Sequence, residues 1–347
     1  MEDLKLKIEA LINNEEMLNK FKENSKEIIK NFSSKKMLVI GDLMLDSYIW
    51  GKAERISPEA PVPVIKVDRS NYTPGGAANV ALNLNSLLST SQIVGVVGSD
   101  PDGTILTDLL TKEGIKSEGI VNDSGRHTTV KTRVIAHSQQ VVRVDREFDE
   151  SVDETVQQEI MKQVARFLPE SDGVILSDYN KGVLTVRIIQ NILDEAHKHK
   201  IPVYVDPKKE NFFYYKGVRL FKPNFNEFIS GVESNEGEKN IEELGVRFQK
   251  QIEAEILLIT QGEKGMMLFS DNSHQVISTK ARLVHDVSGA GDTVISTFAL
   301  SDLSGADPIE AATIANYAAG RVCEEVGVVP INLDMLIDTI DSHNQVS

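Results

Sequence analysis

Cysteine is nearly absent from this sequence of 347 residues. Cys323 is the only thiol, so no disulfide can form within the chain. The N-terminal segment is charged and has no apolar core of the kind that a signal peptide carries, which favours a reducing, cytoplasmic setting. No stretch approaches the roughly 18 apolar residues that a membrane-spanning helix needs, so we expect no membrane partner.

Positive charge is also scarce. Lysine and arginine number 37 against 52 acidic residues, which gives a net charge of −15. Such a chain is a poor partner for nucleic acid or an anionic membrane, and the excess acid most simply serves solubility. A phosphorylated substrate would therefore need basic residues that are gathered locally. Hydrophobic residues, at 41%, leave ample material for a core.

Short apolar runs alternate with helix-like stretches along most of the chain. We expect buried strands at 36–42, 93–98, 173–178, 203–207 and 256–260. The helical pattern falls at 76–89, 102–113, 155–168, 184–198, 240–253 and 293–325. This alternation predicts an α/β fold in which a mostly parallel sheet is flanked by helices on both faces. In such sheets ligands bind beyond the carboxyl ends of the strands.

Two segments break this alternation. Residues 61–67 alternate with prolines, which is typical of an edge strand, and residues 128–146 have the pattern of two strands around a turn. We expect a small antiparallel sheet, inserted as a lid and formed by about 46–72 and 128–146. Residues 1–34 are expected to form a helical extension that packs on the main body, 35–347.

A glycine-rich turn, Gly289-Ala290-Gly291-Asp292, precedes an apolar helical pattern. Small residues let the backbone approach a ligand, and the free N–H groups at a helix start bind anions. An acid at this place can accept a proton from an attacking hydroxyl group, as phosphoryl transfer requires. An ordinary glycine turn with Asp292 as a helix cap fits the same pattern equally well.

A second glycine-rich stretch is Gly75-Gly76-Ala77-Ala78-Asn79. Its glycines allow a close backbone approach, and the Asn79 amide offers a donor and an acceptor to a polyol. Taken alone, this stretch fits a simple turn at the start of a helix equally well.

Together the two stretches resemble the signatures of the PfkB family of ribokinase-like carbohydrate kinases, in the family's order and with its wide separation. The glycine-ended first strand, followed by Asp46, is similar as well. The resemblance covers about 36–330 and implies a ribokinase-like fold. It also implies that Asp292 deprotonates the acceptor hydroxyl group. Backbone N–H groups of an anion hole would come from Gly289, Ala290 and Gly291, and sugar contacts from Asp46, Gly75, Gly76 and Asn79.

The resemblance extends to the cofactors, ATP and Mg²⁺. Asn224 and Glu227 match the family's Asn-x-x-Glu motif near the ATP phosphates, where Glu227 would face Mg²⁺ through water. Asp286 would help to bind a monovalent cation such as K⁺. The family pattern places Thr260, Gly262 and Gly265 beside the nucleotide and Asn316 near the adenine. Lys208 follows an Asp-Pro pair that either reaches the phosphates or simply ends a strand.

Several further stretches resemble the heptose 7-phosphate kinases of this family: 51–64, 139–145, 177–182 and 206–208. This closer resemblance implies transfer to O1 of D-glycero-β-D-manno-heptose 7-phosphate, which gives the 1,7-bisphosphate used for lipopolysaccharide core heptose. Arg55, Arg143 and Lys181 are candidates for holding the substrate phosphate, although each fits a surface or ion-pair role as well. Such kinases are often fused to a nucleotidyltransferase, for which 347 residues leave no room. By analogy we expect a homodimer.

Two other functions remain open at this stage. The first is another sugar kinase of the same fold, acting on fructose, a fructose phosphate, ribose or a nucleoside. The second is a non-catalytic sugar- or nucleotide-binding regulator. The intact motifs at 75–79, 224–227 and 289–292 argue against the regulator.

Overall fold

The computed structural model describes residues 2–137, 139–232, 240–271, 273–279, 287–325 and 327–342. Within these ranges, nine strands form the main sheet in the order β13-β12-β11-β10-β9-β8-β1-β4-β5. The strands are β1 (Lys36–Gly41), β4 (Thr90–Gly98), β5 (Lys116–Asp123), β8 (Gly173–Ser177), β9 (Val203–Asp206), β10 (Leu220–Phe221), β11 (Ile256–Thr260), β12 (Met266–Ser270) and β13 (Ser273–Ile277). All pairings from β11 to β5 are parallel, and β12 and β13 add an antiparallel edge. The predicted, mostly parallel sheet is confirmed.

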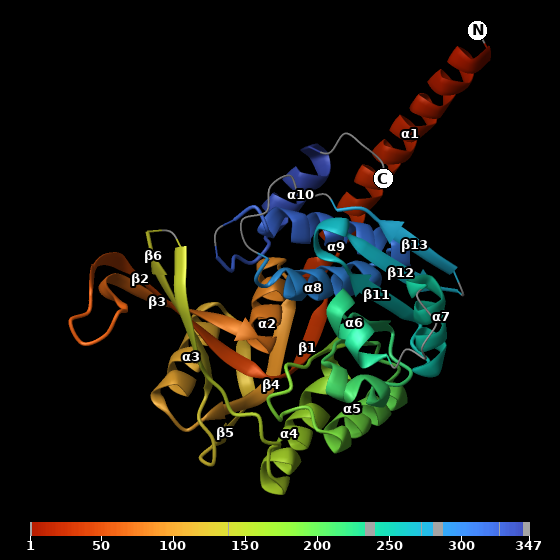
Figure 1. Ribbon diagram of the computed structural model, residues 1–347. Helices are drawn as coiled ribbons and strands as arrows, with labels where there is room; N and C mark the ends of the chain where they lie inside the picture. The colour runs from red at the N-terminus through yellow and green to blue at the C-terminus, as the bar shows by residue number, and fades with distance from the viewer. Residues whose placement is uncertain are drawn as a thin grey trace.

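Helices cover both faces of this sheet (Figure 1). One apolar cluster lies under α2 (Ala77–Ser86), α3 (Pro101–Lys112), α8 (Ala290–Leu303), α9 (Pro308–Val322) and α10 (Leu333–Ser342). The other lies under α4 (Glu154–Phe167), α5 (Val186–His199), α6 (Phe225–Gly231) and α7 (Ile241–Gln251). In β1, Val39 belongs to the first cluster and Leu38 and Ile40 to the second, because side chains alternate along a strand. A strand that is buried on both faces must be apolar throughout, which is why these runs were recognisable in the sequence.

Side-chain caps fix where many of these helices begin. The Asp153 carboxylate accepts the N–H of Val156 at 2.9 Å, and Asp307 forms a capping box with Glu310. The helical stretch predicted over 293–325 is in fact two helices, α8 and α9. Gly305, at φ 98°, interrupts the stretch, and Asp307 then starts the second helix.

A second sheet has the strand order β3-β2-β6-β7 and stands apart from the main sheet. Its strands are β2 (Leu43–Ile56), β3 (Pro63–Gly76), β6 (Thr129–Ala136) and β7 (Gln139–Arg146). The prediction that these two segments share one small sheet is confirmed, with Pro63 at the start of the edge strand β3. The β2–β3 and β6–β7 pairings are antiparallel, whereas β2 and β6 pair in parallel. We call this sheet the lid; in Figure 1 it projects from one side of the body.

The N-terminal extension is the helix α1 (Glu2–Lys30), followed by the short 3-10 helix η1 (Phe32–Ser34). Leu18, Ile28 and Ile29 are buried, and the helix contacts α8, α9 and α10. Its N-terminal part projects beyond the body (Figure 1). Among the helices described, none is both long and apolar enough to cross a bilayer.

Candidate active site

A cavity of about 460 Å³ opens at the carboxyl ends of the main-sheet strands. Asp206 at the end of β9 and Thr260 at the end of β11 line one side, and the first turn of α8 lines the other. This is where parallel sheets place their ligands. The lining includes Asp292, Gly289, Ala290 and Gly291, together with Lys208, Asn224, Glu227, Gly262, Gly265 and Asn316.

Asp292 has a hydrogen-bond donor on each of its carboxylate oxygens. Its side chain lies in the first turn of α8 and the residue is 4% exposed. The amide of Asn79 donates to Oδ2 at 2.7 Å, and the hydroxyl group of Tyr179 donates to Oδ1 at 2.8 Å. Two neutral donors therefore hold the carboxylate in a fixed orientation without neutralising it.

The pKa of Asp292 is raised from 3.8 to about 6. Burial is the main cause, because it disfavours the charged form, and the negative charge of Asp206 adds to it. The bonds from Asn79 and Tyr179 and the positive charge of Lys222 act in the opposite direction. A carboxylate with a pKa near 6 is mostly ionised at neutral pH and is a stronger base than an exposed one.

Tyr179 is held in place by a buried acid beneath its loop. Asp42 accepts the backbone N–H groups of Tyr179 at 2.8 Å, Lys181 at 3.1 Å and Val183 at 3.2 Å. Burial and the charge of Asp178 raise the pKa of Asp42 to about 6. Asp42 therefore joins the end of the first strand to the loop after β8, and this loop carries the Tyr179 hydroxyl group that bonds Asp292.

Glycine is required at two places where the backbone approaches these side chains. A Cβ atom on Gly289, whose φ is 80°, would lie 2.9 Å from Nδ2 of Asn79. A Cβ atom on Gly75 would lie 2.5 Å from Oδ2 of Asp46. The glycines predicted at these positions thus serve close packing around the acids, in addition to any ligand contact.

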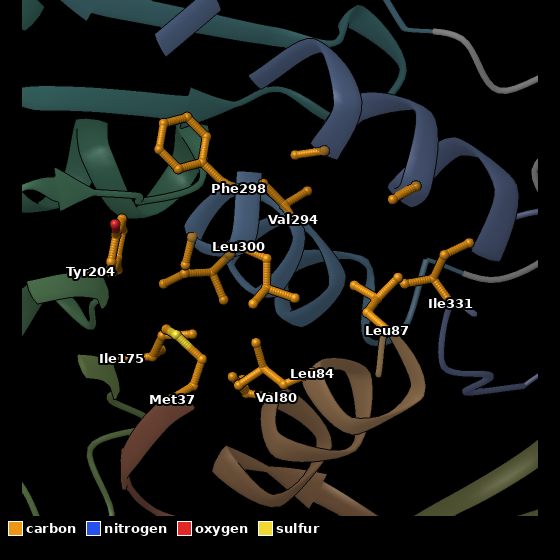
Figure 2. Packing of buried hydrophobic residues seen from close by; sticks show 14 of the residues in the cluster. Met37, Val80, Leu84, Leu87, Ile175, Tyr204, Val294, Phe298, Leu300 and Ile331 are labelled. Carbon is orange, nitrogen blue, oxygen red and sulfur yellow. The ribbon is translucent and has the colours of Figure 1, made fainter. Parts of the chain in front are cut away.

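The helices α2 and α8 begin side by side, which brings the two glycine-rich stretches together. Thr293 donates to Oδ1 of Asn83 at 2.9 Å, and Ser296 donates to the carbonyl oxygen of Val80 at 3.2 Å. Beyond these bonds, Figure 2 shows Val80 and Leu84 of α2 in one apolar cluster with α8 and the sheet. This core fixes the distance between Asn79 and Asp292.

On the side of the cavity formed by β9 to β11, Asn224 and Glu227 form the capping box that starts α6. Asn224 accepts the N–H of Glu227 at 2.9 Å, and Glu227 Oε2 accepts the N–H of Asn224 at 2.9 Å. The other Glu227 oxygen pairs with Lys208. Burial lowers the pKa of Lys208, but the bond to Glu227 and the acids nearby outweigh it and raise the pKa overall. Lys208 therefore remains a cation at the cavity wall.

The sugar-side candidates fall into two sets. Asp46 lies against Gly75 and pairs with Arg133 of β6, so it joins the Gly75–Asn79 stretch beside Asp292. Gly76, at φ 58°, is the residue from which α2 starts. The basic candidates are more dispersed: Arg55 is exposed, Arg143 is exposed on β7, and Lys181 pairs with Glu147 and Asp149.

Arg55 lies nine residues beyond Asp46 on β2, which corresponds to about 30 Å of strand. The structure does not bring it to the Asp292 carboxylate. Asp286, the predicted ligand of a monovalent cation, lies outside the described residues.

The sequence analysis missed four residues that the structure places in this region. Lys222, directly after β10, and Tyr179 line the cavity, while Lys131 and Arg133 of β6 lie beside Asp46 in the lid. The sequence did contain a pattern that indicates Lys222 as a site residue, because a charged residue directly follows the apolar end of a short strand. The others depend on strand register and loop tethering, which sequence spacing does not reveal.

Oxygen donors suited to Mg²⁺ lie on the phosphate side of the cavity, namely Asp206, Glu227 and the Asn224 side chain. Within the described ranges, no group of three or more His, Cys, Asp or Glu side chains is arranged to hold a metal. Magnesium in phosphoryl-transfer sites commonly relies on one or two carboxylates, waters and the substrate phosphates. The donor set fits that mode of binding.

Comparisons with known proteins agree with this geometry. The profile described as pfkB family carbohydrate kinase matches residues 34–334. The chain is 41% identical over 304 residues to the bifunctional protein HldE of Desulfatibacillum aliphaticivorans, covering 87% of this chain and 62% of that protein. It is 40% identical over 322 residues to HldE of Pelobacter propionicus, covering 92% and 66%. The chain thus spans less than two thirds of the length of these relatives.

Solved structures show the same fold. Phosphofructokinase-2 from Escherichia coli in complex with potassium has a TM-score of 0.73, with 16% identity over 88% of this chain and 98% of that chain. The profile covers most of the sequence, and relatives near 40% identity span about nine tenths of it. The chain therefore belongs to the pfkB family of carbohydrate kinases.

Proposed function

We propose that this carbohydrate kinase transfers the γ-phosphoryl group of ATP to O1 of D-glycero-β-D-manno-heptose 7-phosphate, giving the 1,7-bisphosphate for ADP-heptose and lipopolysaccharide core synthesis. The observation that carries the reaction type is the buried Asp292 carboxylate, oriented by Asn79 and Tyr179 in the first turn of α8. The naming of its relatives as HldE supports the heptose substrate.

Asp292 is the general base of the proposed reaction. The acceptor hydroxyl group enters beside its carboxylate, which takes the proton as the new O–P bond forms and the bond to ADP breaks. The N–H groups of Gly289 and Gly291, at the start of α8, would face the transferred group. The N–H group of Ala290 donates to the carbonyl oxygen of Val287 at 3.2 Å, so the structure does not leave it for the anion hole that the sequence predicted. At this end of the helix the other two N–H groups and the helix dipole stabilise negative charge.

The nucleotide occupies the cavity along β9 to β11. Kinases of this family use ATP and a divalent metal. Mg²⁺ would neutralise charge on the phosphates, with Glu227 facing it through water. Lys208 and Asn224 face the phosphates, and Thr260, Gly262, Gly265 and Asn316 surround the nucleoside. The potassium complex of the related fold supports a monovalent cation near Asp286.

The lid supports a substrate that already carries a phosphate. Arg133 and Arg143 lie directly opposite each other on β6 and β7, on the same face as Asp46. Like charges at directly opposed positions destabilise a sheet, so this pair favours a bound anion. Lys131 adds a third cation on this face. Asp46, Asp145 and Glu147 pair with Arg133, Arg143 and Lys131 respectively, and a sugar phosphate would compete with these acids.

Lys181 and Arg55 are weaker candidates within the proposal. Lys181 is held by Glu147 and Asp149 at 2.8 and 2.7 Å, and Arg55 lies far along β2. The proposal therefore assigns the substrate phosphate to Lys131, Arg133 and Arg143, and sugar hydroxyl groups to Asp46, Gly75, Gly76 and Asn79. We propose a homodimer in solution, by analogy with related kinases.

The test is an ATP-consumption assay with a panel of acceptors: heptose 7-phosphate, the same heptose without phosphate, fructose 6-phosphate, ribose and fructose. We expect the highest kcat/KM for heptose 7-phosphate, with the product identified as the 1,7-bisphosphate by ³¹P NMR. A higher kcat/KM for another sugar would replace the heptose with that sugar and leave the kinase chemistry in place. The regulator alternative requires ligand binding without turnover on any member of the panel.

A further inference from the structure

The two oxygens of the Asp292 carboxylate differ in where their donors lie. Asn79 donates to Oδ2 at 2.7 Å, and the hydroxyl group of Tyr179 donates to Oδ1 at 2.8 Å. Tyr179 and Asp292 line the cavity, whereas Asn79 is buried. The bond between Tyr179 and Oδ1 is therefore the one that an acceptor hydroxyl group meets when it reaches the base from the cavity.

The backbone that carries Tyr179 is held by two acids. Asp42 accepts the N–H groups of Tyr179 and Lys181 at 2.8 and 3.1 Å. Asp178 accepts the N–H group of Asn180, between them, at 2.8 Å. With its loop fixed in this way, the Tyr179 hydroxyl group can leave Oδ1 by rotation of the side chain alone.

The Tyr179 ring has a contact that does not use its hydroxyl group. Nζ of Lys208 lies 5.4 Å from the ring centroid, and Lys208 also pairs with Glu227. The ring is thus attracted to a cation on the proposed phosphate side of the cavity. Burial, and then the charge of Asp292, raise the pKa of the Tyr179 hydroxyl group well above its usual value. This group stays protonated and can donate to Oδ1, but it does not act as a base.

We propose that Tyr179 is a specificity-determining residue that favours a sugar over water as the acceptor: its hydroxyl group covers Oδ1 of Asp292 until a bound sugar hydroxyl group replaces it. The inference rests on the proposed role of Asp292 as the base but not on which sugar is used. Without this cover, a water molecule at Oδ1 gives its proton to Asp292 and its oxygen bonds to phosphorus. The electron pair of the broken P–O bond leaves with ADP, and the products are ADP and inorganic phosphate.

The cost of displacing the Tyr179 hydroxyl group explains the selection. A neutral hydrogen bond changes an equilibrium constant by about tenfold. A water molecule at Oδ1 gains no more than the bond that it replaces. A sugar is also bound at groups remote from the reacting oxygen, proposed here to include Asp46 and Gly75, and that binding offsets the cost. The displaced hydroxyl group can then donate to an oxygen of the sugar.

The first test compares ATP hydrolysis with phosphoryl transfer in Tyr179→Phe, which keeps the ring beside Lys208 and removes only the hydroxyl group. Inorganic phosphate is measured without an acceptor, and sugar phosphate with the acceptor that the wild-type protein uses best. We expect the ratio of hydrolysis to transfer to rise at least about tenfold, the worth of the lost bond. An unchanged ratio overturns the proposal.

A double variant separates this inference from the proposed function. Asp292→Asn combined with Tyr179→Phe should lose the additional hydrolysis, because water needs the same base as the sugar. Additional hydrolysis that persists in the double variant contradicts Asp292 as the base. An unchanged ratio in Tyr179→Phe, together with an inactive Asp292→Asn, contradicts the role of Tyr179 alone.

The second test asks whether Tyr179 leaves Asp292 when the acceptor binds. The pH profile of kcat/KM reports the free enzyme, and the rate constant of a single turnover at saturating acceptor reports the complex. We expect Tyr179→Phe to move the acid limb of kcat/KM to higher pH and to leave the acid limb of the single turnover in place. Equal movement of both limbs means that Tyr179 stays on Asp292 and overturns the proposal. Tyr214→Phe, at an exposed tyrosine, is the matched control and is expected to match wild type in both tests.

Discussion

The two walls of the candidate active site are built differently. The nucleotide wall consists of strand ends of the main sheet, in which β1 is buried along nearly its whole length. The proposed sugar wall is the lid, in which every residue of β7 is exposed. The first wall can hold Asp292, Lys222 and Lys208 to fixed positions because two apolar clusters support the strands behind them. The second presents ion pairs at the surface, such as Arg143 with Asp145.

The largest effect on kcat is expected at Asp292, the proposed general base. Asp292→Asn keeps the shape and the bond to Asn79 but cannot accept the acceptor proton. We expect kcat to fall by about 10²–10⁴, the usual range for a general base, while ATP still binds. Turnover near the wild-type level in the folded variant would remove Asp292 from this role. Stopped-flow kinetics and nucleotide titration measure the two properties separately.

The packing within the lid can be tested at Gly75, which lies on β3 against Asp46 of β2. In Gly75→Ala the new Cβ atom displaces the Asp46 carboxylate, since it would otherwise lie 2.5 Å from Oδ2. We expect kcat/KM for the sugar to fall about 10- to 100-fold, because small misplacements in a site carry large costs. KM for ATP should hardly change. A parallel rise in both KM values would show that the two walls are not independent.

If the lid binds the substrate phosphate, a substitution in the lid should change the affinity for the phosphorylated acceptor alone. Arg143→Ala should raise KM for a phosphorylated acceptor about tenfold or more, which corresponds to one hydrogen bond to a charged group, without raising KM for ATP. The same sugar without phosphate should show no difference between variant and wild type. Arg146→Ala on the same strand is the control, because its side chain projects from the other face. Equal effects on sugar and ATP would place Arg143 outside the sugar site.

The smallest effect is a shift in pH dependence. Below a pH of about 6 Asp292 becomes protonated and cannot act as a base, so kcat/KM should fall with pH through that value. Tyr179→Phe removes a hydrogen bond that lowers the pKa of Asp292, so the acid limb should move to higher pH. We expect a shift of less than about one pH unit. Tyr214→Phe, an exposed tyrosine, serves as the control. If the acid limb of the kcat/KM profile does not move in Tyr179→Phe, a group other than Asp292 controls that limb.

The difference between the buried main sheet and the exposed lid also explains which parts of the structure could be predicted from the sequence. The strand predicted at 256–260 is β11 without change, because burial on both faces leaves an uninterrupted apolar run. The two-residue strand β10 was not predicted, since two apolar residues carry no period. The glycine-rich stretches were visible because close packing around Asp46 and Asn79 permits no side chain there.

The sequence did not show which of the basic residues lie near the proposed sugar site. Arg55, Arg143 and Lys181 all fitted a phosphate role in the sequence, yet strand register places only Arg143 opposite Arg133. Lys181 is bound by two acids that are distant in sequence. Which face a charged side chain occupies depends on pairing between segments that are far apart along the chain, and a single sequence does not contain that information.

The parallel pairing of β2 and β6 has a consequence for how the protein folds. Met44 pairs with Thr129, so this ladder closes only after α2, β4, α3 and β5 have been brought together. Contacts of such long sequence separation form slowly, because the entropy of closing the loop must be met first. The β2–β3 hairpin can form early, but the lid acquires its sugar-facing surface late. Amides of β6 should therefore gain protection from hydrogen exchange after those of β1 and β4 during refolding.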